Sequence, residues 1–147
     1  MEFGTCPRNF YNSGPPGEAK IHTLNPHRVK RILEVTGWDF LEPGSLNIEV
    51  EIGVVDDLLK YEPTFTEDGK DVNYPEKYKR IPLLRIAYHY YLGYARTDTE
   101  EQQVLVRRVV NPVTNHRVEL YGPVSLKKKY QLEVGDEIVV RLEQDEK

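Results

Sequence analysis

Alternation of apolar and polar positions marks most of this chain as β-strand. Between Ser45 and Ile52 the apolar residues fall at every second position, which is the period of a strand buried on one face. Clusters of Pro, Gly and Asn separate the apolar segments and are typical of turns. Shorter or weaker patterns of the same kind predict strands at 5–11, 20–24, 83–94, 104–110, 118–121 and 138–142.

One segment has the period of a helix instead. Asn25 is a suitable N-cap, and Pro26 fits the first helical position. Apolar residues then recur on one face until Gly37, which can adopt the left-handed conformation that ends a helix. The expected helices span 26–36, 54–61 and 126–132.

The order of these elements predicts a mainly β fold. The strands are short and irregularly spaced, and no alternation of strand and helix appears, so a small closed barrel with one main helix and a short C-terminal helix fits best. The 147 residues are expected to form a single domain over 1–147. Residues 62–82 are rich in Pro, Asp, Glu and Lys and are predicted to form a surface excursion from it.

Composition narrows the classes of partner. The chain has 20 basic and 24 acidic residues, and its net charge of −4 disfavours a nucleic-acid binder. A single cysteine, Cys6, excludes an intrachain disulfide and favours the reducing cytoplasm. No apolar run approaches the roughly 20 residues of a membrane span, and no secretory signal is evident, so no membrane partner is expected. Nothing in the sequence indicates an oligomeric state.

The clearest chemistry lies where the best strand begins. Ser45 and Asn47 are two residues apart, so their side chains point to one side, whereas Leu46 points into the core. Hydroxyl and amide oxygens are hard donors that suit Mg²⁺, which takes its other ligands from water and nucleotide phosphates. The alternative is an ordinary strand start, in which both side chains only satisfy a turn.

Several segments resemble one family in order and spacing. Gly44-Ser45-Leu46-Asn47-Ile48 resembles the Gly-Thr-Leu-Asn-hydrophobic motif of the archaeal CTP-dependent riboflavin kinases. Residues 29–43, 109–126 and 132–138 are similar to the segments that precede the motif, follow it and close the family's domain. The resemblance runs from about Cys6 to Leu142, interrupted by 62–82. It implies a six-stranded cradle-loop barrel that transfers the γ-phosphoryl group of CTP to the ribityl hydroxyl of riboflavin, forming FMN.

The resemblance also implies roles for individual residues. Ser45 and Asn47 match the two Mg²⁺ ligands of the family, and Glu119 lies where a carboxylate could orient or deprotonate the flavin hydroxyl. Candidate residues for binding the flavin are Tyr88, Tyr90 and His116. A run of tyrosines can stack on a flat ring. The alternatives are a solvated strand carboxylate for Glu119 and ordinary half-buried strand positions for the tyrosines.

The phosphate-binding loop departs from the family pattern. The family carries Gly-x-Gly-x-Gly, and here Gly14 and Gly17 remain as the nucleotide-binding candidates, with Lys20 as a nearby positive charge. Pro15 and Pro16 stand between the glycines and have no N–H to donate. This departure supports an alternative function: a non-catalytic barrel that binds a nucleotide, a flavin or a protein.

Two adjacent arginines are a further candidate. Arg107 and Arg108 precede Val109 in a predicted strand, so one of them is expected to face the mouth of the barrel, where an anion could bind.

Overall fold

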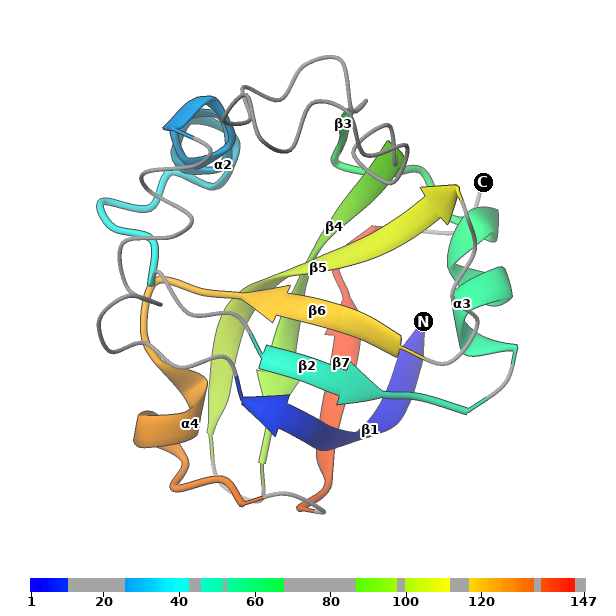
Figure 1. Ribbon diagram of the computed structural model, residues 1–147, viewed down its shortest axis with the longest axis vertical. Helices are drawn as coiled ribbons and strands as arrows, with labels where there is room; N and C mark the ends of the chain where they lie inside the picture. Colours follow the sequence, from blue (N-terminus) through cyan, green and yellow to red (C-terminus); the bar gives the residue numbers. More distant parts are fainter. Residues whose placement is uncertain are drawn as a thin grey trace, which may run out of the picture.

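The computed structural model describes residues 1–10, 26–42, 46–51, 53–67, 87–97, 100–111, 117–133 and 136–144. Most of these residues belong to strands (Figure 1). The strands are β1 (Glu2–Phe10), β2 (Leu46–Glu49), β3 (Phe65–Glu67), β4 (Ala87–Arg96), β5 (Glu101–Asn111), β6 (Arg117–Tyr121) and β7 (Ile138–Leu142). The helices are α2 (Pro26–Thr36), α3 (Val54–Asp57), the 3₁₀ turn η1 (Leu58–Lys60) and α4 (Leu126–Lys129).

The strands form one antiparallel sheet that curls strongly. Their order is β3-β4-β5-β6-β2-β1-β7, and β4 makes an additional pairing with β7. The first part of β4, at Tyr88–Tyr90, pairs with β3, and only its last part, at Gly93–Arg96, pairs with β7. The sheet is therefore a curled half-barrel that is open at the end where β3 and β4 pair.

The mainly β class and the main helix are confirmed. The helix predicted over 26–36 coincides with α2, and the short helices predicted over 54–61 and 126–132 correspond to α3 with η1 and to α4. The closed six-stranded barrel is not confirmed, because β4 divides its length between β3 and β7 and leaves the half-barrel open. The strand predicted over 20–24 lies outside the described residues.

Part of the segment predicted as an excursion, 62–82, belongs to the sheet. Phe65–Glu67 form β3, and they pair with Tyr88–Tyr90 of β4. Phe65 is buried, and its ring stacks on that of Tyr90 with 4.3 Å between the centroids. This aromatic contact anchors the start of the segment to the sheet. The remainder, 68–82, lies outside the described residues.

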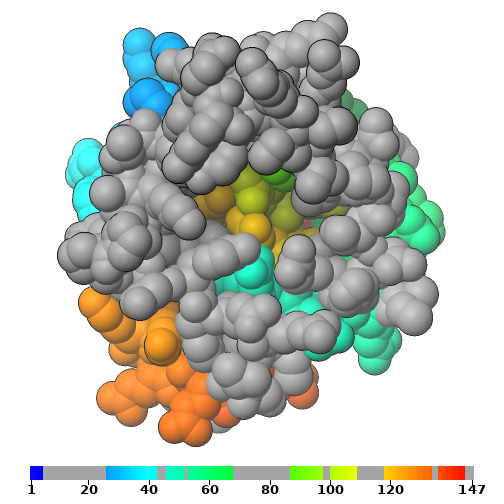
Figure 2. All heavy atoms as spheres, viewed as in Figure 1, coloured from blue at the N-terminus to red at the C-terminus, as the bar shows by residue number. Residues whose placement is uncertain are grey.

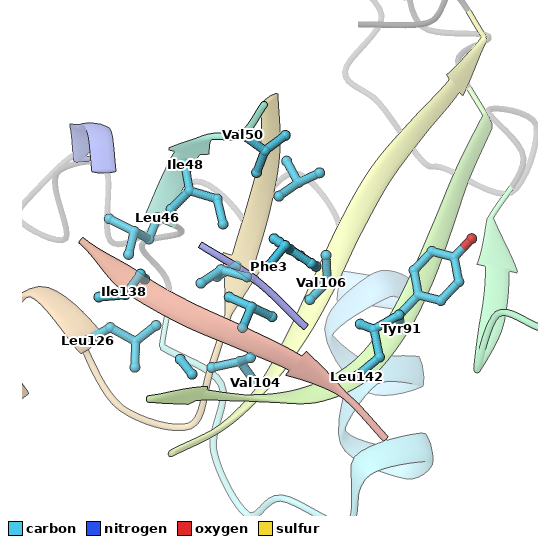
Figure 3. Close-up of a cluster of buried hydrophobic side chains, with 14 of the residues drawn as sticks. Phe3, Leu46, Ile48, Val50, Tyr91, Val104, Val106, Leu126, Ile138 and Leu142 are labelled. Carbon is cyan, nitrogen blue, oxygen red and sulfur yellow. The ribbon is translucent and has the colours of Figure 1, made fainter. Parts of the chain in front are cut away.

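Apolar side chains cover both faces of the sheet. Figure 3 shows side chains from several strands meeting on the inner, concave face, and all strands except β3 contribute to this inner cluster. On the outer face, Val29 and Ile32 of α2 cover Tyr90, Leu105 and Tyr121. Because α2 covers the outer face, a strand can have buried side chains on both of its faces.

The contact between β4 and β7 requires a glycine. A Cβ atom on Gly93 would lie 2.5 Å from the backbone oxygen of Arg141, which is closer than van der Waals contact permits. Gly93 is thus the position at which the two strands come close enough to pair.

Candidate functional site

The register of three strands brings two predicted site residues together. Asn47 of β2 lies opposite Glu119 of β6, and Glu119 lies opposite Arg107 of β5. Their neighbours Ile48, Val118 and Val106 belong to the inner cluster, so alternation places Asn47, Glu119 and Arg107 on the outer face. Figure 2 shows a hollow in this side of the molecule, and β2, β5 and β6 contribute to its floor.

Asn47 is more deeply buried than the strand pattern predicts. Asn47 is only 2% exposed, although it lies on the face of β2 opposite to Leu46 and Ile48, which face the inner core. Its Oδ1 atom is buried and has no hydrogen-bond partner among the described residues. A buried amide oxygen without a partner costs about 1–3 kcal/mol, so a ligand that the oxygen could coordinate would stabilise it.

Arg107 and Tyr121 hold the Glu119 carboxylate in place. The Nη2 atom of Arg107 donates to Oε2 of Glu119 over 2.6 Å, and the hydroxyl of Tyr121 donates to the same oxygen over 3.2 Å. The Glu119 side chain is 16% exposed, so it is not a solvated strand carboxylate. The carboxylate therefore has a fixed orientation on the outer face of the sheet.

Arg107 supplies a permanent positive charge beside Glu119. Burial alone lowers the pKa of Arg107, but the Glu119 carboxylate and the neighbouring Tyr121 and Tyr90 together raise it well above the ordinary value. For Tyr121, burial raises the pKa of the hydroxyl, and the nearby positive charge of Arg107 only partly opposes this rise. Arg107 is consequently a cation and Tyr121 a neutral hydrogen-bond donor at physiological pH.

The two predicted tyrosines occupy different environments. Tyr88 is half-buried and lies close to two guanidinium groups, with its ring centroid 4.3 Å from Cζ of Arg107 and 5.3 Å from Cζ of Arg28. Tyr90 is fully buried and stacks on Phe65, and burial raises its pKa. Tyr88 therefore borders the site, whereas Tyr90 is part of the outer core beneath it.

A buried ion pair attaches α2 to β3 next to these tyrosines. Arg28 donates through Nη2 to Oε1 of Glu67 over 2.6 Å and through Nε to both carboxylate oxygens over 3.0 Å. Both residues are 8% exposed. Burial and the nearby Arg107 lower the pKa of Arg28, but Tyr90, Glu67 and Tyr121 together raise it above the ordinary value. The pair fixes the helix over the outer face.

Sequence reasoning missed several partners at this site. Tyr121, Arg28 and Glu67 carry no local pattern that distinguishes them, whereas the strand alternation did single out one of Arg107 and Arg108. Five predicted site residues lie outside the described part of the chain: Gly14, Gly17, Lys20, Ser45 and His116.

The described residues offer an amide oxygen, not a carboxylate cluster, to a metal ion. Within them, no three His, Cys, Asp or Glu side chains gather in a way that could hold a metal.

No helix of the described ranges is long and apolar enough to cross a lipid bilayer. Comparison of the chain with models of known protein families found no match, and neither did comparison with curated proteins.

Proposed function

We propose that this protein is a CTP-dependent riboflavin kinase-like phosphotransferase that converts riboflavin to FMN with Mg²⁺. One observation carries the proposal: Asn47 pairs with Glu119 across β2 and β6 on the outer face, and its buried Oδ1 has no hydrogen-bond partner among the residues that the structure describes. These are the two described residues that the motif resemblance assigns to the metal ion and to the flavin hydroxyl. The proposal includes a cradle-loop barrel as the scaffold.

The donor set at the metal side fits Mg²⁺. Asn47 offers an amide oxygen, and Ser45 is proposed to add a hydroxyl from the residue two positions before it. When bound, Mg²⁺ would neutralise charge on the nucleotide phosphates and hold them for in-line transfer. Gly14, Gly17 and Lys20 are proposed to hold the phosphates of CTP.

On the acceptor side, Glu119 would orient the ribityl hydroxyl. Phosphoryl transfer depends mainly on positioning and charge neutralisation, so an orienting carboxylate is sufficient. The ion pair with Arg107 supports this role, because it fixes the carboxylate and adds a positive charge near the transferred group. His116 is proposed to contact the flavin as well.

The flavin ring would lie against Tyr88. This tyrosine is half-buried and borders Arg107, so its ring is near the reacting end of the site. Tyr90, buried on Phe65, would support Tyr88 from beneath, with a tilted ring contact of 6.4 Å between centroids. Stacking on aromatic rings is typical of sites for flat ligands.

One observation favours the alternative of a non-catalytic barrel. Oε2 of Glu119 already accepts from Arg107 and Tyr121, so this oxygen is engaged by protein donors and not directed at a flavin hydroxyl. Such a barrel would keep the outer-face site as a binding site for a nucleotide, a flavin or a protein, without transfer.

FMN formation tests the proposal. Riboflavin would be incubated with CTP, ATP or GTP, each with and without Mg²⁺, and FMN measured by chromatography with fluorescence detection. We expect CTP- and Mg²⁺-dependent FMN in the wild type, none in Asn47→Ala and a large loss in Glu119→Gln. Glu49→Gln, on the exposed end of the same strand, is the matched control. Binding of riboflavin or CTP without FMN formation would establish the non-catalytic alternative.

A further inference from the structure

The inner face of the sheet carries a second arginine that the outer-face site does not use. Arg108 follows Arg107 in β5, so it projects to the opposite side, where it lies across from His89 of β4. Arg108 is 0% exposed. Its Nε atom donates to the backbone oxygen of Val55 in α3 over 2.7 Å. This single hydrogen bond fixes the plane of the guanidinium group.

The other edge of this guanidinium group has no hydrogen-bond partner within the described ranges. Both Nη1 and Nη2 of Arg108 are buried, and neither has a hydrogen-bond partner in the described part of the chain. Nor does a carboxylate of the described residues form an ion pair with it. In agreement, burial lowers the pKa of Arg108, against smaller opposing effects of Tyr91 and Asp56. The buried charge therefore has no hydrogen-bonded counter-ion among the described residues.

A second buried donor without a partner in the described ranges lies on the same face of the sheet. Tyr91 is on the inner face of β4, one diagonal step from Arg108, and its hydroxyl is buried without a hydrogen-bond partner among the described residues. Figure 3 shows the Tyr91 ring at the border of the inner cluster, with its oxygen pointing away from the apolar side chains. The guanidinium group of Arg108 and the hydroxyl of Tyr91 are thus two buried polar groups at the same end of the sheet.

This arrangement suits an anion with two oxygens. The Nη1–Nη2 edge of a guanidinium presents parallel N–H groups, which match the oxygens of a carboxylate or a phosphate. A phenol hydroxyl next to that edge can donate a further hydrogen bond. A buried charge and a buried hydroxyl are both costly when unpaired, and one oxyanion would satisfy both.

We infer that Arg108 and Tyr91 form an anion-binding site on the inner face of the sheet. The site takes the carboxylate or phosphate group of a small molecule. It is separate from the proposed phosphotransfer site, because consecutive residues of β5 face opposite sides of the sheet. The inference does not depend on the protein being a kinase.

Anion-dependent melting of the full chain tests this site. Sodium phosphate and sodium acetate would be titrated against sodium chloride at equal ionic strength. Binding to the folded state alone raises the melting temperature with the logarithm of the anion concentration once the site saturates. We expect this rise with phosphate or acetate but not with chloride, and the more effective anion identifies the preferred group.

Variants separate this site from surface effects. Arg108→Met should abolish the anion-dependent rise, and without anion it should melt no lower than the wild type, because an unpaired charge is removed. Tyr91→Phe should weaken phosphate or acetate binding about tenfold, the effect of one charge-assisted hydrogen bond. Arg141→Met removes an exposed arginine of β7 and should leave the rise unchanged. Asn47→Ala should also leave it unchanged.

Two results would overturn the inference. One is a wild type that responds to phosphate and acetate no more than to chloride. The other is a response that persists in Arg108→Met, which would locate the anion elsewhere. If Arg108→Met does not fold, Arg108→Lys and Tyr91→Phe decide the question. Affinity for the anion as high as that of the wild type in both of them would equally exclude the site.

Discussion

Replacing Asn47 with leucine removes a buried amide oxygen that has no partner among the described residues. If this oxygen is kept for a metal ion, it destabilises the protein whenever the ion is absent. The substitution should then have opposite effects on stability and on function. Buried functional groups commonly show this trade-off.

The magnitude follows from the surroundings of Asn47. An unsatisfied buried acceptor costs about 1–3 kcal/mol. Asn47 is 2% exposed, so leucine would place apolar surface in a largely dry position. Part of the gain is offset because leucine is larger than asparagine and must be accommodated. We expect the free energy of unfolding to rise by about 2 kcal/mol, which for a chain of this size raises the melting temperature by roughly 4–8 °C.

The assay compares melting without ligand and FMN formation with CTP and Mg²⁺. Asn47→Leu should melt higher than the wild type and form no FMN, whereas the control Glu49→Gln should match the wild type in both. A lower melting temperature for Asn47→Leu would refute the reasoning, since the oxygen would then have a stabilising partner. A higher melting temperature with unchanged FMN formation would refute the metal role alone.

Three other perturbations test the fold. Arg28→Met leaves the Glu67 carboxylate buried and unpaired, so the free energy of unfolding, measured in urea, should fall by about 3–5 kcal/mol. Adding Glu67→Leu should recover most of this loss, and a loss below about 1 kcal/mol in Arg28→Met would contradict the ion pair. Gly93→Ala should lower the free energy of unfolding by about 2 kcal/mol or more, because the new Cβ atom meets the backbone of Arg141. In the control Gly4→Ala the Cβ atom meets only the flexible end of Glu137 at 3.3 Å, so the loss should be less than about 1 kcal/mol. Equal losses would refute the close pairing of β4 and β7. Burial raises the pKa of Tyr91 to about 12, so the unfolded chain loses this proton first, and Tyr91 should contribute about 2–3 kcal/mol to the fall in the free energy of unfolding between roughly pH 10 and pH 12. The fall should be smaller by this amount in Tyr91→Phe, and an identical fall would contradict the burial of Tyr91.

Local patterns predicted the elements that carry their own signal. Pro26 and the helical period defined α2, and the alternation around Asn47 defined β2. The motif that contains Asn47 and the strand that contains Glu119 were identified separately. Their pairing across β2 and β6 depends on register, which the sequence does not specify without knowing which strands are neighbours.

The remaining features depend on contacts between distant residues. β3 has only three residues, and it is recognisable only once Phe65 stacks on Tyr90. Alternation predicts one buried face per strand, so it could not anticipate that Asn47 is buried on the other face. The same holds for Arg28 with Glu67 and Arg107 with Glu119, because no local rule relates residues 39 and 12 positions apart.

The place of β1 in the sheet has a consequence for synthesis of the chain. β1 pairs with β2 on one side and with β7 on the other, where Glu2 lies opposite Arg141. During translation the edge that will receive β7 stays unpaired until residues 138–142 have left the ribosome. Unpaired strand edges promote association between chains, and sheets built from distant segments fold slowly. We therefore expect the nascent protein to require protection by chaperones, and its soluble yield to depend on the rate of synthesis.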